Sequence, residues 1–183
     1  MVKPVRFFAF TAVLGCFLPV TKVTATFWGD WGKAEYCPLG EWVIGFALKT
    51  EKPQGEGDDT ALNSISLKCS GGSLIYSTQA PWGDWGSNFI CPAGSWLDSC
   101  QLRVESQLGD GDDTAANNLN CKCSNGETLR GDGASWGDWK EWTSPCRDGF
   151  MAIRTRVEEP QASGDDTALN DVEFICWEKR DSR

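Results

Sequence analysis

The heptapeptide GDDTALN spans residues 57–63 and returns twice, as GDDTAAN at 111–117 and as GDDTALN at 164–170. The steps between successive copies are 54 and 53 residues. Self-similarity at a fixed period of this order is the signature of an architecture built from repeated units. The chain of 183 residues is therefore expected to consist of three related units of about 54 residues each.

A second block recurs in the same order and at the same period. Each unit opens on Trp-Gly-Asp-Trp, at 28–31, 82–85 and 136–139. The predicted repeats run over about 28–81, 82–135 and 136–177. No unit of this size buries its apolar face alone, so the three are expected to pack around a shared axis as a single domain over 26–183.

Each unit is predicted to form β-strands. Residues 42–49 alternate with the period of a half-buried strand, and the inward face is predicted to carry Trp42, Ile44, Phe46 and Leu48. Residues 64–69 alternate in the same way, and Gly71-Gly72 makes a tight turn after them. Because no segment shows a sustained helical period, the domain is predicted to be all-β with pseudo-threefold symmetry. Trp42 and its counterpart Trp96 are expected in the core.

The first 25 residues have the pattern of a secretory signal peptide. Residues 1–25 hold three basic residues and no acid, an apolar run over 7–18, and a small-residue ending, Val23-Thr24-Ala25. The apolar run is too short for a membrane anchor. Cleavage after Ala25 would leave 14 basic against 26 acidic residues, so neither nucleic acid nor membrane insertion is expected. The protein is therefore predicted to be secreted.

Two features of the composition bear on chemistry. The chain has no histidine, which excludes Ser-His-Asp and Cys-His catalysis and histidine-ligated zinc. Of nine cysteines, Cys16 would leave with the signal peptide, and an even number in a secreted chain indicates disulfides rather than metal ligands or a nucleophile. No cofactor is expected.

The repeat narrows the disulfide pairing. Six cysteines fall into two symmetric classes, 37, 91, 146 and 69, 123, 176. The simplest pairing joins one of each class within a unit and leaves one further pair: Cys37–Cys69, Cys91–Cys123, Cys146–Cys176 and Cys100–Cys121. Symmetry equally permits pairing between neighbouring units.

The fourth pair has counterparts in the other units. A shift of one repeat places Phe46 and Leu67 at the positions of Cys100 and Cys121, and the third unit has Ile153 and Phe174 there. If Phe46 and Leu67 are in contact, the same cross-strand position holds an apolar pair in two units and a disulfide in the other.

These motifs resemble those of the vitelline membrane outer layer protein family, through the Trp-Gly-x-Trp openings, the thrice-repeated GDDTA block and eight mature cysteines. The resemblance covers the whole mature chain. It implies a β-prism of three Greek-key sheets; a β-trefoil is the runner-up, but its units are usually shorter. It also implies a secreted component of the egg's outer layer or of other secretions, and a fold shared with jacalin-like lectins, which is an analogy of fold alone. The family supplies no catalytic residues.

The repeated acidic pairs are the first candidates for binding carbohydrate. They are Asp58, Asp59, Asp112, Asp113, Asp165 and Asp166. Carboxylates bind sugar hydroxyls or calcium, or act in pairs on a glycosidic bond. Gly-Asp-Asp-Thr also forms loops through side-chain bonds to nearby backbone amides, and its occurrence once per unit favours that structural role. Adjacent carboxylates point to opposite faces of an extended chain, so one pair cannot flank a scissile bond.

The second tryptophan of each opening block is the other candidate: Trp31, Trp85 and Trp139. An exposed indole stacks on the apolar face of a sugar ring, whereas a buried one would plug the end of a sheet. Three exposed copies would gain by avidity on a polymeric glycan.

The sequence thus predicts a non-catalytic, disulfide-stabilised component of an extracellular coat or fluid, whose partners are coat proteins or glycans. The alternative is a lectin-like module for N-acetylglucosamine-type glycans, which requires a concave polar site with at least one exposed tryptophan. A weak glycosidase or transglycosylase is the remote alternative, since it requires two carboxylates from different segments in one cleft.

Overall fold

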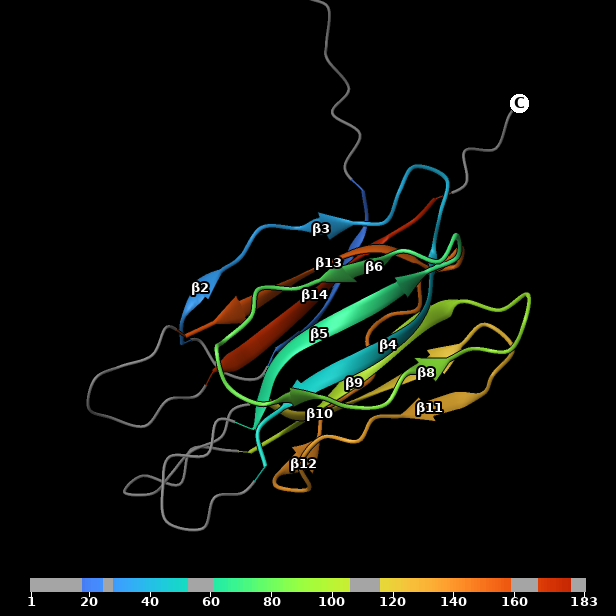
Figure 1. The fold of residues 1–183 in the computed structure, drawn as a ribbon. Helices are drawn as coiled ribbons and strands as arrows, with labels where there is room; N and C mark the ends of the chain where they lie inside the picture. The colour runs from blue at the N-terminus through green and yellow to red at the C-terminus, as the bar shows by residue number, and fades with distance from the viewer. Residues whose placement is uncertain (1–17, 25–27, 53–60, 106–115, 159–167, 179–183) are drawn as a thin grey trace, which may run out of the picture.

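In the computed structural model of the chain, the structure describes residues 18–24, 28–52, 61–105, 116–158 and 168–178. These residues form an all-β domain of three curled sheets (Figure 1), as the alternation of apolar residues predicts. In the described ranges no helix is present that is long and apolar enough to cross a membrane.

The three sheets share one topology, in which two long antiparallel strands lie between shorter ones. The first sheet has the order β6 (Leu74–Tyr76), β5 (Leu62–Cys69), β4 (Val43–Thr50), β7 (Asp84–Trp85), with β8 (Phe89–Ile90) also beside β4. The second has the order β11 (Thr128–Arg130), β10 (Ala116–Cys123), β9 (Leu97–Val104), β12 (Asp138–Trp139). The third has the order β1 (Val20–Thr24), β14 (Leu169–Cys176), β13 (Phe150–Val157), β2 (Asp30–Trp31), with β3 (Glu35–Tyr36) also beside β13. A fourth strand that returns beside the first is the Greek-key order.

The sequence repeats and the sheets are out of phase. The first strand of the second and third units pairs with a long strand of the preceding unit, β7 with β4 and β12 with β9, and β2 of the first unit pairs with β13 of the third. The glycine of each block makes this close approach, because a Cβ on Gly83 would meet the backbone of Thr50. Every repeat therefore contributes to two sheets, which ties the three units together.

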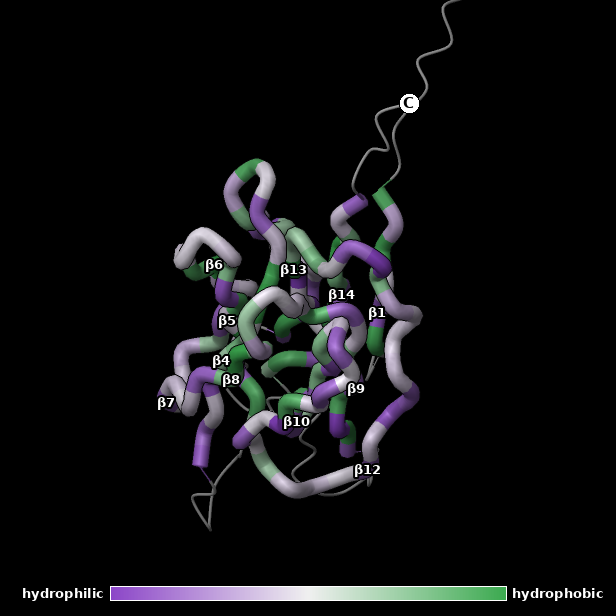
Figure 2. The backbone as a smooth tube through the Cα atoms, turned by 90° about the vertical axis from the view of Figure 1, so that its right-hand side faces the viewer, coloured by the Kyte–Doolittle hydropathy of each residue, from purple (hydrophilic) through white to green (hydrophobic). Residues whose placement is uncertain are grey.

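The third sheet is closed by the N-terminal strand. All five residues of β1 pair with β14 (Figure 2), and β1 takes the place that β6 and β11 hold in the other sheets. Val23 is only 4% exposed and belongs to the core. These residues lie within the predicted 1–25 signal peptide, and cleavage after Ala25 would remove them. A chain cleaved after Ala25 would therefore lack the outer strand of the third sheet.

The inner faces of the sheets form one core, and a cross-strand pair lies at the same place in each. Phe46 faces Leu67, Cys100 faces Cys121 and Ile153 faces Phe174, and all six side chains are at most 1% exposed. The disulfides are Cys37–Cys69, Cys91–Cys123, Cys100–Cys121 and Cys146–Cys176, the pairs within units that the repeat predicts. The expected contact is thus hydrophobic in two sheets and covalent in one.

The prediction that Trp42 and Trp96 are core residues is wrong. A bulge lies between Val43 and Gly45, so the inward face of β4 begins with Val43, and Ile44 turns outward. Trp42 precedes the strand and is half-buried against Trp177, with 5.7 Å between ring centroids. Trp96 is also half-buried. An insertion of one residue moves the following side chains to the other face of a strand, which simple alternation does not foresee.

Replacement of the second-sheet pair tests how much the covalent bond adds to packing. Cys100→Ala with Cys121→Ala should lower the free energy of unfolding by about 4 kcal/mol, since it opens a closed loop and leaves a cavity. Cys100→Ile with Cys121→Phe, the pair of the third sheet, should lower it by less. Urea unfolding followed by tryptophan fluorescence measures both. Equal losses would show that packing at this position contributes nothing.

Candidate functional site

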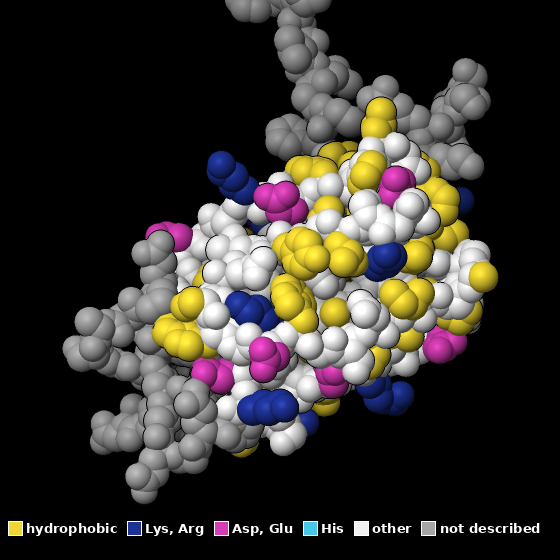
Figure 3. Space-filling view, viewed as in Figure 1, with side chains coloured by type: hydrophobic (Ala, Val, Ile, Leu, Met, Phe, Trp, Pro, Cys, Tyr) yellow, Lys and Arg dark blue, Asp and Glu magenta, His cyan; other side chains and the backbone are white. Residues whose placement is uncertain are grey.

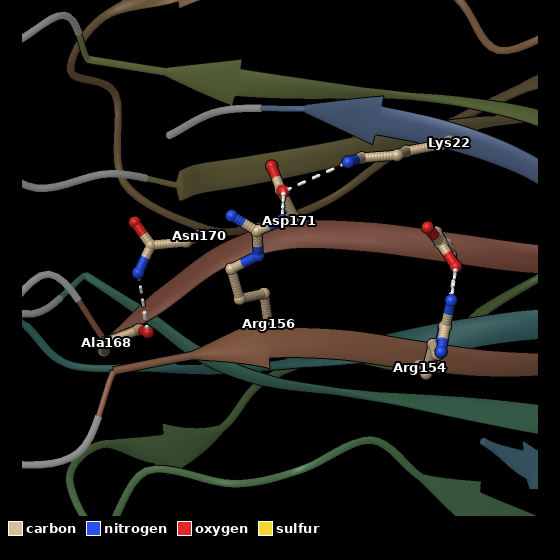
Figure 4. Close-up of polar contacts among 7 residues, drawn as sticks. Lys22, Arg154, Arg156, Ala168, Asn170 and Asp171 are labelled. Atoms are coloured by element: carbon tan, nitrogen blue, oxygen red, sulfur yellow. Dashed lines mark hydrogen bonds and ion pairs between the residues drawn. The ribbon is translucent and has the colours of Figure 1, made fainter. Parts of the chain in front are cut away.

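The six aspartates of the GDDT blocks lie outside the described residues, so the structure does not locate these candidates. It does describe the base of two blocks. The amides of Glu51 and Glu158 donate to the carbonyls of Ala61 and Ala168, both at 2.8 Å. The final asparagine of these two blocks also donates to that alanine carbonyl, at 3.2 Å from Asn63 and, in Figure 4, at 3.3 Å from Asn170. Part of the repeated spacing within the block is therefore explained by these hydrogen bonds at its base.

The ten tryptophans are all at the surface. None is buried, and those exposed or half-buried are Trp28, Trp31, Trp42, Trp82, Trp85, Trp96, Trp136, Trp139, Trp142 and Trp177. Trp82 comes nearest to the role of a plug, because it packs on the small cluster of Ala80, Val157 and Ala168. An indole that keeps part of its ring in water is available to stack on a ligand.

The three predicted tryptophans differ in what covers them. Each faces a basic residue of the neighbouring long strand, Arg156 for Trp31, Lys49 for Trp85 and Arg103 for Trp139. Three cations lie 4.9–5.1 Å from the ring of Trp31, and Arg103 lies 5.8 Å from the ring of Trp139.

Trp85 is the exception among the three. The amino group of Lys49 donates instead to the carbonyls of Ala80 and Pro81, at 2.9 and 3.2 Å. The described contacts of Trp85 include an edge-to-face one with Tyr76, at 5.5 Å between ring centroids, and no cation–π pair. Trp85 is 39% exposed, and of the three it is the indole best placed to meet a ligand.

Trp85 also lines a cavity of about 470 Å³ between the first and second sheets. The cavity wall combines two indoles with three carboxylates from three segments: Trp85, Trp136, Glu51, Asp84 and Asp132. Indole faces and hydroxyl-binding carboxylates are the two kinds of group that a neutral sugar needs, and the cavity is concave as well as polar.

The carboxylate of Asp132 is held in a fixed position. It accepts a hydrogen bond of 2.7 Å from the amide of Ser87, and a Cβ on Gly86 would lie 2.6 Å from its oxygens. Sequence reasoning missed Asp84, Asp132 and Trp136. The aspartate of the Trp-Gly-Asp-Trp block does recur three times, and that recurrence was the available signal. In the described ranges no group of three or more Asp, Glu or Cys side chains is arranged to hold a metal ion.

A second cavity, of about 360 Å³, lies at the equivalent place beside Trp31. Trp31, Thr78 and Glu158 in this cavity correspond by the repeat to Trp85, Asp132 and Glu51 in the first. The third counterpart would include residues 24–28, which lie partly outside the described ranges. The pseudo-threefold symmetry therefore produces related cavities where neighbouring sheets meet.

The outer faces of the sheets differ in chemistry. Figure 3 shows apolar side chains gathered over the first sheet, where Leu74, Tyr76, Trp85 and Ile90 are each 39–43% exposed. The third sheet instead carries a network of ion pairs (Figure 4). Asp171, with no exposed side-chain surface, lies 3.4 Å from Lys22 and 3.3 Å from Arg156, and Arg154 lies 2.6 Å from Glu173.

Three Greek-key sheets around a pseudo-threefold axis, with indoles at the surface, define a β-prism domain of the kind seen in lectins. The fold is similar to a prostate-specific WGA16 glycoprotein lectin, with a TM-score of 0.57, 11% identity, and coverage of 86% of this chain and 96% of that one. It is also similar to Calystegia sepium agglutinin, with a TM-score of 0.58, 7% identity, and coverage of 86% and 95%. At this identity the likeness concerns the fold alone.

The chain belongs to the vitelline membrane outer layer protein I family, whose model matches residues 19–179. It is 45% identical over 156 residues to the human vitelline membrane outer layer protein 1 homolog, covering 81% of this chain and 77% of that protein. It is 42% identical to the mouse homolog, covering 81% and 78%. The family match begins one residue before β1, so it includes the strand that closes the third sheet.

Proposed function

We propose that this protein is a secreted, non-catalytic component of an extracellular coat or fluid that contacts neutral glycans in the cavity lined by Trp85 and Trp136. The observation that carries the proposal is the cavity in which the 39%-exposed Trp85 stands beside three carboxylates. It has the concave polar wall and the exposed tryptophan that a sugar site requires. Membership in the vitelline membrane outer layer family and the names of its relatives support the coat role.

The composition of the cavity selects the ligand class. Among the described residues that line the cavity, three are acidic, Glu51, Asp84 and Asp132, and one is basic, Lys52, so an anionic sugar would be repelled. Carboxylate oxygens accept hydrogen bonds from sugar hydroxyls and from an acetamido N–H. Neutral, N-acetylglucosamine-type oligosaccharides are therefore the expected ligands. Four disulfides suit a domain that works outside the cell.

A tryptophan-fluorescence titration with chito-oligosaccharides tests the site. The wild-type protein should give a saturable change, and Trp85→Ala should weaken the affinity about 5- to 150-fold, because stacking of one ring on an aromatic side chain is worth roughly 1–3 kcal/mol. Trp139→Ala is the matched control, since Trp139 is 38% exposed, occupies the equivalent position and lies beside Arg103. It should bind almost as the wild type does.

Two outcomes would contradict the proposal. A flat response to chito-oligosaccharides, and to a broad array of neutral glycans, would remove the glycan contact and leave a coat protein whose partners are other proteins. Mass spectrometry of the oligosaccharides after long incubation tests the absence of catalysis. Their length should not change, and the appearance of shorter or longer chains would show glycosyl transfer.

A further inference from the structure

The outer faces of the second and third sheets are related position by position. In the third sheet, one row across the strands places Arg156 opposite Asp171, and the next joins Arg154, Glu173 and Lys22. In the second sheet the corresponding rows are Arg103 opposite Asn118, and Gln101, Asn120 and Arg130. The two carboxylates of the third sheet are thus replaced by two neutral amides.

This replacement leaves cations without counter-charges. Among the described residues, the three recorded ion pairs all belong to the third sheet. The second sheet keeps the cations Arg103 and Arg130, and adds Lys122 in the next outward row. The strand residues that share these rows are Ser99, Gln101, Asn118, Asn120 and Thr128, none of them acidic. The acids nearest in sequence are Asp98, which lies at the bulge of β9 and accepts a hydrogen bond from Ser99, and Asp138, Glu127 and Glu141 of the neighbouring segments.

The cations of this face are held by their neighbours rather than neutralised. Nε of Arg103 donates to the carbonyl of Gly137 at 2.9 Å, and Lys122 lies 4.1 Å from the ring of Trp142. Asn120 is only 7% exposed, and its Oδ1 is recorded without a hydrogen-bond partner. That oxygen is covered by its neighbours, and the amide brings no negative charge to this face.

We propose that the outer face of the second sheet binds an anionic polysaccharide. Sulfate or carboxylate groups of the polysaccharide pair with Arg103, Arg130 and Lys122. Arginine is suited to this task because its guanidinium meets both groups with two parallel hydrogen bonds. This site goes beyond the proposed neutral-glycan cavity, which lies elsewhere and has the opposite charge.

A polysaccharide fits this face better than a second copy of the chain does. The chain carries a formal net charge of −9, so two copies repel each other at long range. A linear polyanion can lie along this patch alone, and its repeated groups engage several cations at once.

The test compares binding to dextran sulfate, polygalacturonate and neutral dextran, each immobilised, at 50 and 200 mM NaCl. The protein should bind one or both polyanions and not neutral dextran. Comparison of dextran sulfate with polygalacturonate then shows whether sulfate or carboxylate groups are bound. With three cations engaged, the affinity should fall roughly tenfold or more between the two salt concentrations. Asn118→Asp with Asn120→Glu, which copies the carboxylates of the third sheet, should reduce binding at least tenfold.

Two single substitutions that each remove one positive charge provide the control. Arg130→Gln should weaken binding several-fold, whereas Lys33→Gln, an exposed cation between β2 and β3, should not. Equal binding of dextran and dextran sulfate would overturn the proposal, as would wild-type binding by the double variant with an unchanged melting temperature. Self-association at low salt that the double variant loses would assign the face to a second copy and also overturn it. The chito-oligosaccharide titration fails or succeeds independently of these results.

Discussion

A chain that begins at residue 26 is expected to be about 3–5 kcal/mol less stable than one that begins at residue 18. Removal of β1 exposes the long strand β14, which pairs with all five residues of β1. It takes Val23 out of the core, and complete burial of such a side chain is worth about 1.5–3 kcal/mol. It also removes Lys22 from the buried carboxylate of Asp171, and a buried charge that loses a partner is strongly destabilised.

Urea unfolding of the two chains, followed by tryptophan fluorescence, measures this difference. Because the strand is required for stability, the secreted protein should retain it, and N-terminal sequencing should find a first residue at or before Val20. A mature chain that starts at Thr26 and is as stable as the longer one would contradict the expectation. Lys22→Gln in the longer chain is the matched variant that isolates the ion pair, and it should account for the smaller part of the loss.

The strand β1 also shows where sequence reasoning is ambiguous. Residues 18–25 end an apolar stretch with small side chains, which is the pattern of a cleavage site, yet Val-Thr-Lys-Val-Thr alternates as a strand does. The two patterns are compatible with the same residues. The third sheet decides between them, because β1 is paired with β14 there along its whole length.

Regular features of the fold could be predicted because they repeat. The repeat predicted the all-β units, the pairing of Cys100 with Cys121 and the equivalence of Trp31, Trp85 and Trp139, whose exposure or burial it left open. The cavities could not be predicted, because their walls come from segments of two successive units and from the linker before the next opening block. The difference in charge between the outer faces of the second and third sheets could not be predicted either. It depends on the strand register, which places an arginine opposite Asn118 in one sheet and opposite Asp171 in the other.

The glycine of the opening block is expected to be the most sensitive single position. Gly83 has φ +78°, and Gly94, in the turn before β9, has φ +83°. Alanine pays about 1–2 kcal/mol for this left-handed conformation at either site. A Cβ at Gly94 would meet nothing within 4 Å, whereas at Gly83 it would lie within 2.6 Å of the backbone of Thr50 and Glu51.

Gly83→Ala should therefore lower the free energy of unfolding by at least about 3 kcal/mol, and Gly94→Ala by no more than about 2 kcal/mol. The difference measures the close approach of one unit's opening block to the strand of the preceding unit. Urea unfolding of both variants gives it directly. Equal losses would mean that β7 can move away from β4 without cost, and that the out-of-phase pairing contributes little to the joining of the units. Trp85 follows Gly83 closely and lies in β7. Displacement of this backbone by Gly83→Ala should therefore also weaken sugar binding in the cavity.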